Sequence, residues 1–232
     1  MKSAESFYRL SIKLDPNYTN SYIGLANLLT SQEKFEEAEK LYLRAIEIDP
    51  QYSWTYNNLG QLYFTQKSYT KAENLWLQSL KLDPKNFYTL DNLGKLAEDK
   101  KDFVTAENFY LQSLKINPNF LSPLLNLATL KFIIQKDYAR STELLERAIL
   151  LAPESGELRA DLALSLLRQG NREAALRVGK KAVELGFKGP HDALIELKLT
   201  PELDPKQELI NLTPATDEIR LDGIVQSVNA AS

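Results

Sequence analysis

The chain has 232 residues, a formal net charge of -3 at pH 7 and a pI near 5.4. This balance provides no basic surface for nucleic acid, so nucleic acid is not an expected partner. The absence of cysteine excludes disulfides and thiolate chemistry, and no apolar run reaches the roughly 18 to 20 residues that a membrane-spanning helix needs, so we expect no membrane insertion.

The N-terminal residues, MKSAESFYRLSIKLDP, lack the continuous apolar core and the cleavage site of a signal peptide. The sequence therefore predicts a cytoplasmic protein. A periplasmic or secreted location stays open for a chain from which an upstream signal has been removed.

Residue types that carry catalysis are sparse. The only histidine, His191, has no second histidine or cysteine at metal-ligand spacing. The sequence also lacks a glycine-rich phosphate loop and a nucleophile-elbow motif. We therefore expect no enzymatic activity, no cofactor and no metal site.

An internal repeat organises the chain. Prolines recur every 34 residues and once after 35, at Pro16, Pro50, Pro84, Pro118 and Pro153. The clearest unit, residues 53–84, carries an aromatic residue, a Leu-Gly pair, a tyrosine, an alanine, a second aromatic residue and a proline, at Tyr56, Leu59-Gly60, Tyr63, Ala72, Trp76 and Pro84. This order and spacing resembles the tetratricopeptide repeat (TPR), a helix–turn–helix unit of 34 residues. The resemblance implies an all-α fold, a right-handed α-solenoid of stacked hairpins.

The repeat columns divide the chain. The solenoid is expected over residues 1–187, with an orphan second helix at 1–16 and repeats at 17–50, 51–84, 85–118, 119–153 and 154–187. The fourth full unit has one extra residue near positions 132–137, which lengthens its first helix or its turn. A closing helix is expected over 188–200, followed by a C-terminal tail, 201–232, with a possible short helix at 214–228.

Both ends leave alternatives open. The orphan helix would lack cover for Phe7, Tyr8, Ile12 and Leu14, either because the chain is a fragment of a longer solenoid or because this helix is a natural cap or docking edge. The tail can be disordered, a strap on the solenoid or an occupant of its groove.

Small residues are expected to determine how closely the helices pack, and polar residues to determine where the turns form. Gly60 is expected to face Ala72, so that the two helices of a repeat approach closely, and Trp76 to fill space against the next unit. N-caps of the second helices are expected at Ser68, Asp102, Asp137 and Asn171. Asp-Pro and Asn-Pro pairs should separate the repeats.

The resemblance also implies a concave groove lined by the first helices, where a partner segment would bind. One column of these helices holds Asn58, Asn92 and Asn126. Asparagine offers both a donor and an acceptor, so such a row can hold the backbone amides of an extended peptide. Similar asparagine ladders occur in the TPR superhelix of O-linked N-acetylglucosamine transferases. The alternative is that asparagine simply suits this column of TPR helices.

Other outward positions complete the predicted peptide-binding site. They are Asn27, Trp54, Asn57, Gln61, Tyr88, Asp91 and Lys95. Trp54 and Tyr88 should begin adjacent first helices, where they either anchor an apolar or proline side chain or pack against the preceding turn.

One known TPR binding mode is disfavoured. Asn27 and Asn58 match the asparagines of the clamp with which chaperone-binding TPR domains grip a C-terminal carboxylate. The basic columns of that clamp, however, hold Ile23, Tyr88 and Asn92 here. Without these cations a carboxylate would lose its charge-assisted hydrogen bonds.

Three functional hypotheses follow. The first is a protein-interaction scaffold that binds an extended peptide or partner segment in its concave groove. The second is the substrate-recognition arm of a larger enzyme, such as a glycosyltransferase. The third is a self-assembling structural module, a homo-oligomer formed through the N-terminal helix.

Overall fold

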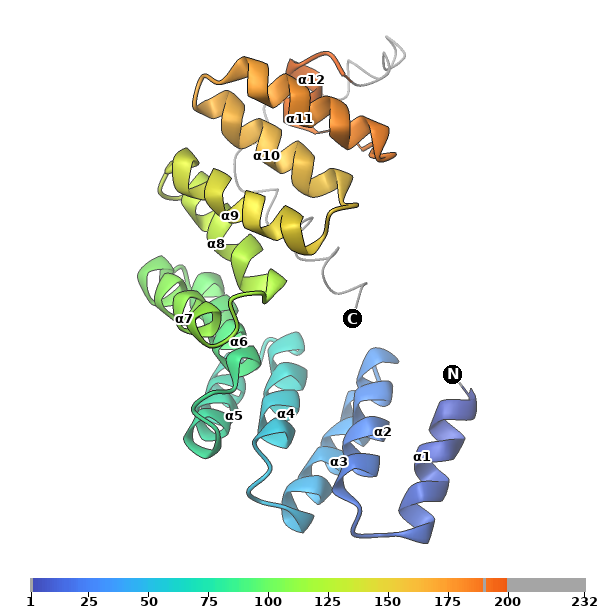
Figure 1. Ribbon diagram of the computed structural model, residues 1–232. Coiled ribbons are helices and arrows are strands. Elements are labelled where there is room, and N and C mark those ends of the chain that lie inside the picture. Colours follow the sequence, from blue (N-terminus) through green and yellow to red (C-terminus); the bar gives the residue numbers. More distant parts are fainter. Residues whose placement is uncertain (1, 190, 200–232) are drawn as a thin grey trace. The chain divides into compact units, whose positions relative to one another are not determined.

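The computed structural model describes residues 2–189 and 191–199. In this part of the chain it consists of twelve α-helices and contains no strand (Figure 1). The helices are α1 (Lys2–Leu14), α2 (Thr19–Ser31), α3 (Phe35–Ile48), α4 (Ser53–Thr65), α5 (Tyr69–Leu82), α6 (Phe87–Asp99), α7 (Phe103–Ile116), α8 (Leu121–Ile133), α9 (Tyr138–Leu151), α10 (Gly156–Arg168), α11 (Arg172–Glu184) and α12 (Asp192–Glu196).

The chain divides into two compact units, Met1–Pro123 and Leu124–Ser232. In the first unit α2 pairs with α3, α4 with α5 and α6 with α7, while α1 packs on α2. In the second unit α10 packs on both α9 and α11, and α12 covers α10 and α11. Helical hairpins therefore build each unit, as the repeat pattern predicts.

The turn inside most hairpins follows one pattern. After the first helix comes a residue with positive φ, which is Glu33, Lys67, Lys101 or Gly170. The N–H of the next residue then returns to a carbonyl five residues earlier, as in the 2.8 Å bond from Ser68 to Tyr63. This is the Schellman motif, which satisfies carbonyls that the end of a helix leaves unpaired.

The extra residue of the fourth full repeat lies in its turn. Helix α8 has the same length as α2, α4 and α6, whereas residues 134–137 separate α8 from α9. The N–H of Asp137 reaches back to the carbonyl of Lys131, one residue further than in the other turns. The insertion is thus absorbed without changing either helix.

Most expected N-caps form. The side chains of Asp102, Asp137 and Asn171 accept a hydrogen bond from the backbone N–H three residues on, at 3.1, 3.0 and 3.3 Å. Ser68 stands at the N-cap of α5, but its hydroxyl makes no capping bond. Each cap that forms satisfies one of the N–H groups that lack an intrahelical partner.

The Asx-Pro pairs close the repeats through the aspartate or asparagine. The side-chain Oδ1 of the residue before proline accepts a bond from the backbone N–H after the proline, at 3.0–3.2 Å, for Asp15, Asp49, Asp83 and Asn117. Proline has no N–H and cannot continue the helix. The pair therefore both ends one repeat and shapes the turn into the next.

The helix glycines make room for aromatic rings, which corrects the packing expected from the sequence. A Cβ added to Gly60 would lie 2.6 Å from Nε1 of Trp76, and one added to Gly94 would lie 2.4 Å from Cε1 of Tyr110. Both rings are fully buried. Trp76 therefore packs on the first helix of its own repeat, where the sequence predicted Ala72 as the neighbour of Gly60.

Helix α1 is only partly covered. Tyr8 and Ile12 pack against the core of the first unit, and the ring of Tyr8 lies over Gly24 of α2. Phe7 is 68% exposed and Leu14 is 78% exposed. The expectation that part of this helix lacks cover thus applies to its outer side.

Helix α12 is shorter than the helix expected over 188–200. It has five residues, and Ala193 and Leu194 are fully buried against the end of the second unit. The side chain of His191 caps it by accepting a bond from the N–H of Ala193. Residues 200–232, with the helix expected at 214–228, lie outside the described residues.

Candidate functional site

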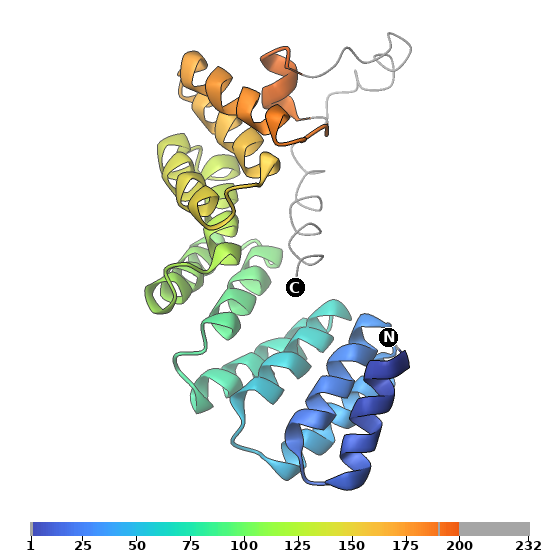
Figure 2. The ribbon, with the colours of Figure 1, turned by 45° about the vertical axis from the view of Figure 1, so that its right-hand side comes forward.

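The predicted site residues of the first unit lie on three neighbouring helices. α2 contacts α4, and α4 contacts α6, so the first helices of successive repeats form one face, called here the first-helix face (Figures 1 and 2). The second helices α3, α5 and α7 lie behind it. Asn126 is on α8 in the second unit, where it is half-buried.

A chain of amide hydrogen bonds crosses this face. Asn92 Nδ2 donates to Asn57 Oδ1 at 3.0 Å, and Asn57 Nδ2 donates to Asn58 Oδ1 at 3.1 Å. Asn58 Nδ2 in turn donates to Asn27 Oδ1 at 3.2 Å. The predicted ladder residues of the first unit are therefore connected to one another from α6 through α4 to α2.

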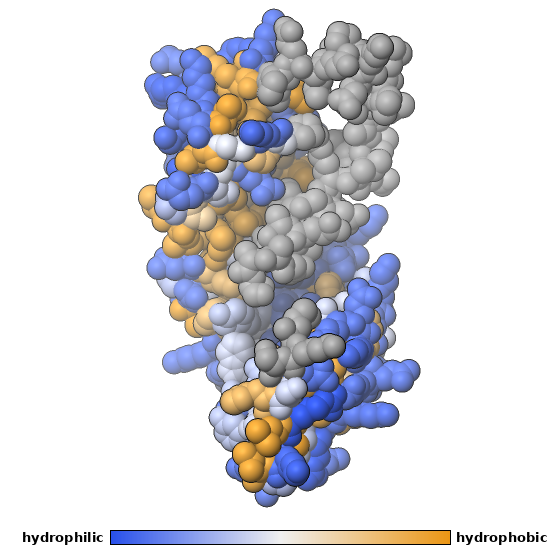
Figure 3. Space-filling view, turned by 90° about the vertical axis from the view of Figure 1, so that its right-hand side faces the viewer, coloured by the Kyte–Doolittle hydropathy of each residue, from blue (hydrophilic) through white to orange (hydrophobic). Residues whose placement is uncertain are grey.

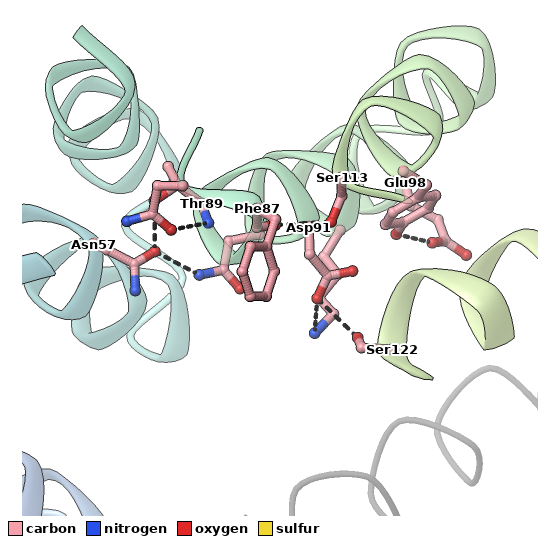
Figure 4. A network of polar contacts seen from close by, with 11 residues as sticks. Asn57, Phe87, Thr89, Asp91, Glu98, Ser113 and Ser122 are labelled. Atoms are coloured by element: carbon pink, nitrogen blue, oxygen red, sulfur yellow. Dashed lines mark hydrogen bonds and ion pairs between the residues drawn. The ribbon is translucent and has the colours of Figure 1, made fainter. Parts of the chain in front are cut away.

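The amide chain rests on buried groups below it. Thr89 Oγ1 donates to Asn57 Oδ1 at 3.0 Å (Figure 4). It also lies 3.0 Å from Ser79 Oγ. The hydroxyl of Tyr42 donates to Asn27 Oδ1, and burial raises the pKa of Tyr42 to about 12. Because each amide has a fixed partner, the orientation of each side chain is held by the fold.

The members of the chain differ in their access to solvent. Asn57 is buried at 6% exposure, whereas Asn27 is exposed and Asn58 and Asn92 are half-buried. Among the described residues, Asn92 Oδ1 and the second N–H of Asn58 have no hydrogen-bond partner. Exposed Gln61 lies one turn further along α4. Asn57 thus supports the face, and the other amides present hydrogen-bonding groups on it.

The acidic residues on α6 are paired. Asp91 is buried at 2% exposure, accepts a 2.8 Å bond from Ser122 and forms a 2.9 Å ion pair with Lys95 (Figure 4). Glu98 accepts a 2.7 Å bond from the hydroxyl of Tyr110. Burial raises the pKa of Glu98, while the bond from Tyr110 lowers it. Since Lys95 already pairs with Asp91, it is not a separate cation for an anionic ligand.

Trp54 and Tyr88 come together at the N-terminal ends of α4 and α6. Their ring centroids are 5.1 Å apart, with an interplanar angle of 57°. Tyr88 also stacks on Phe87 at 4.3 Å and meets Phe120 edge-on at 4.9 Å. Tyr88 therefore packs on three other rings and Trp54 packs on Tyr88, while 36% of Trp54 and 41% of Tyr88 remain exposed.

Several residues of this face are not predicted by the repeat pattern. Phe87, Thr89 and Phe120 lie outside the outward columns of the repeat, whereas Ser122 follows Trp54 and Tyr88 in their column. Phe87 directly precedes Tyr88 in the sequence, and this pair of adjacent aromatic residues is a local signal for the cluster. Phe120 shares its column with Tyr18 and Tyr52, and Thr89 shares its column with Ser21 and Thr55. Which columns touch depends on packing between repeats, which the pattern does not specify.

No group of three histidine, cysteine, aspartate or glutamate side chains among the described residues could hold a metal ion. Nor is any described helix both long and apolar enough to cross a membrane. On the face shown in Figure 3, hydrophobic side chains reach the surface as separate patches between hydrophilic ones.

Comparison with solved structures supports the fold. PilF of Pseudomonas aeruginosa is 20% identical with a TM-score of 0.69, covering 80% of this chain and 84% of that protein. BtubC from P. vanneervenii is 19% identical with a TM-score of 0.66, covering 82% and 91%. YrrB, described as a TPR protein with an unusual peptide-binding site, is 19% identical with a TM-score of 0.59, covering 82% and 97%.

Comparison with curated protein sequences gave no significant match. Family profiles, by contrast, match along most of the repeat region. A profile described as TPR repeat matches residues 26–67, and profiles described as tetratricopeptide repeat match residues 53–86, 88–120 and 135–193. The matches agree with the helical hairpins, and the chain belongs to the tetratricopeptide repeat family.

Proposed function

We propose that this protein is a protein-interaction scaffold that binds an extended segment of a partner protein on its first-helix face. Asn58 and Asn92 would bond to the backbone amides of that segment, with Asn27 and Gln61 beside them. Asn126, on α8 of the second unit, has the position in its repeat that Asn58 and Asn92 have in theirs. Its amide would offer the same kind of donor and acceptor.

The amide chain from Asn92 to Asn27 is the observation that carries this proposal. A flexible amide loses rotamer freedom when it binds a ligand, and that cost reduces affinity. Here the amides are already oriented by bonds to one another and to buried hydroxyls. They can therefore bind a peptide backbone at a lower entropic cost.

A neutral polar face also suits a peptide backbone. The carboxylate of Asp91 is paired with Lys95 and Ser122, so the helices present amides rather than a concentrated charge. The description of YrrB as a TPR protein with an unusual peptide-binding site offers a precedent within the same fold. Such amides would recognise the backbone, while neighbouring side chains would set specificity.

The test is capture of partners from native lysate, with identification by mass spectrometry. We expect an Asn58→Ala/Asn92→Ala variant to lose the partner that the unchanged chain captures. A matched control is Asn74→Ala/Asn108→Ala, which removes two exposed asparagines from the second helices α5 and α7. Circular dichroism and denaturation would verify that both variants fold. Undiminished capture by the first variant would contradict the proposal.

The exposed side of α1 favours a second candidate, self-assembly. Phe7, Leu10 and Leu14 are 68%, 54% and 78% exposed on this helix, and apolar residues at such spacing form one helical face. If copies associate through it, light scattering should give a mass that rises with concentration and falls to the monomer value in a Phe7→Glu variant. A constant monomer mass at all concentrations would exclude this candidate.

A further inference from the structure

Four aromatic rings form a cluster at one end of the first-helix face. The aromatic cluster consists of Trp54, Phe87, Tyr88 and Phe120, with Tyr88 at its centre. Phe87 and Phe120 are half-buried and lie 5.1 Å apart, and so hold Tyr88 from two sides. Trp54 and Tyr88 keep more than a third of their surface exposed. The cluster is thus a rigid apolar surface that is open to solvent on its Trp54–Tyr88 side.

This open side shares its helix faces with the amides. Trp54 precedes Asn58 by four residues on α4, and Tyr88 precedes Asn92 by four residues on α6. Residues four apart in a helix lie on the same side, about one turn or 5.4 Å apart along the axis. A segment that contacts both rings is therefore within reach of both amides.

The combination of rings and amides selects a particular ligand chemistry. A polyproline II helix has no internal hydrogen bonds, so its carbonyl groups are free to accept bonds from protein donors. Its proline rings dock in grooves lined by aromatic side chains. The second N–H of Asn58 can supply such a donor beside the rings. Lys95, the lysine on α6 of this face, pairs with Asp91 and so is not a separate cation for a carboxylate or phosphate.

We propose that the aromatic cluster recognises a proline-containing segment in the polyproline II conformation. One proline ring would pack on the exposed side of the Trp54–Tyr88 pair, and a following carbonyl would accept a bond from Asn58. This inference rests on the proposed function, because it names the class of segment that the first-helix face binds.

A fluorescein-labelled proline decamer tests the inference by anisotropy titration of the full chain. We expect saturable binding to the unchanged protein, and binding at least 10-fold weaker to a Gly-Ser decamer with the same label. Trp54→Ala and Tyr88→Ala should each weaken binding of the proline decamer about 10-fold or more, since aromatic anchors dominate such interfaces. Tyr88→Phe, which keeps the ring, should bind as the unchanged protein does.

Tyr18→Ala is the matched control. Tyr18 is 49% exposed, precedes α2 and is not in the aromatic cluster, so its removal should leave the affinity unchanged. Should Tyr88→Ala fail to fold by circular dichroism, Trp54→Ala alone carries the comparison. Absence of proline-decamer binding, equal affinity for the Gly-Ser decamer, or equal affinity of Trp54→Ala would overturn the inference.

The two proposals fail in different ways. If the captured partner is lost from Asn58→Ala/Asn92→Ala but not from Trp54→Ala, the amides bind a segment that needs no proline. That result overturns the proline inference and leaves the proposed function standing. If capture survives in all of these variants, the proposed function itself is wrong.

Discussion

Single side chains distinguish otherwise equivalent repeats, and Thr55 is the clearest case. Two hydroxyl pairs stand at the same position of the repeat, with one repeat between them: Ser11–Ser21, 2.6 Å apart, and Ser79–Thr89, 3.0 Å apart. Between them, Ala45 stands where a serine would pair with Thr55, and Thr55 Oγ1 is buried without a partner among the described residues.

Ala45→Ser should therefore stabilise the protein. The new hydroxyl would pair with Thr55, and a buried hydrogen bond of this kind contributes about 1 kcal/mol. The measurement is the free energy of unfolding by urea, with Ser79→Ala as the control expected to lose a similar amount. An Ala45→Ser variant that is less stable would show that the column has no room for the hydroxyl there.

Glu98 gives the fold a pH dependence. Burial raises the pKa of Glu98 in the folded state, against an ordinary value of 4.5. A raised folded-state pKa means that the stabilisation is fully present below the unfolded pKa and is lost as pH rises through the folded pKa. Stability contributed by Glu98 should thus fall from about pH 4.5 upward.

Glu98→Gln should remove this pH dependence, because the amide does not ionise in this range and can still accept the bond from Tyr110. Relative to the unchanged protein, the variant should gain stability as the pH rises from 4 to 7. Glu73→Gln, at an exposed residue that pairs with Lys100 on the protein surface, serves as the control. A difference between wild type and Glu98→Gln that stays constant across pH would contradict the assignment.

At the scale of the element, the hairpin turns depend on one residue with positive φ. Lys67 has φ 57° and Lys101 has φ 60°, whereas Gly170 fills the same position at φ 79°. A non-glycine residue in this left-handed region costs about 1–2 kcal/mol, and glycine, which lacks Cβ, avoids that cost.

Lys67→Gly should therefore stabilise the protein by about 0.5–1 kcal/mol, since part of the gain is offset by greater freedom of the unfolded chain. Lys81→Gly, within α5, is the control, and it should destabilise by about 1 kcal/mol. Thermal unfolding monitored by circular dichroism measures both. A loss of stability in Lys67→Gly would mean that the lysine side chain contributes contacts that outweigh its backbone strain.

The sequence predicts the helices well and their contacts less well. Local chemistry fixes where elements begin and end, so Asp102 caps α7 and Asp83 closes the repeat before α6. The neighbour of Gly60 depends on how two helices cross, which a column pattern does not specify. The pattern therefore predicted Ala72 where the structure has Trp76.

In the molecule as a whole, the candidate site too is predicted only in part, because a column pattern does not specify contacts between helices. The asparagine column predicts which residues share a face, because the repeat places them at equivalent helix positions. It does not predict that Asn57 is buried, nor that Asn92 of the next repeat donates a hydrogen bond to it. Packing between repeats decides both, and it joins Phe120 to the aromatic cluster, which the aromatic residues Tyr18 and Tyr52 of the same column do not predict.

Site-specific photo-crosslinking tests whether the partner segment lies on the first-helix face. A benzophenone amino acid would replace exposed Gln61 on α4 in one variant and Leu77, 50% exposed on α5, in another. We predict that the captured partner crosslinks from position 61 and not from position 77. Crosslinking from position 77 alone would contradict the claim.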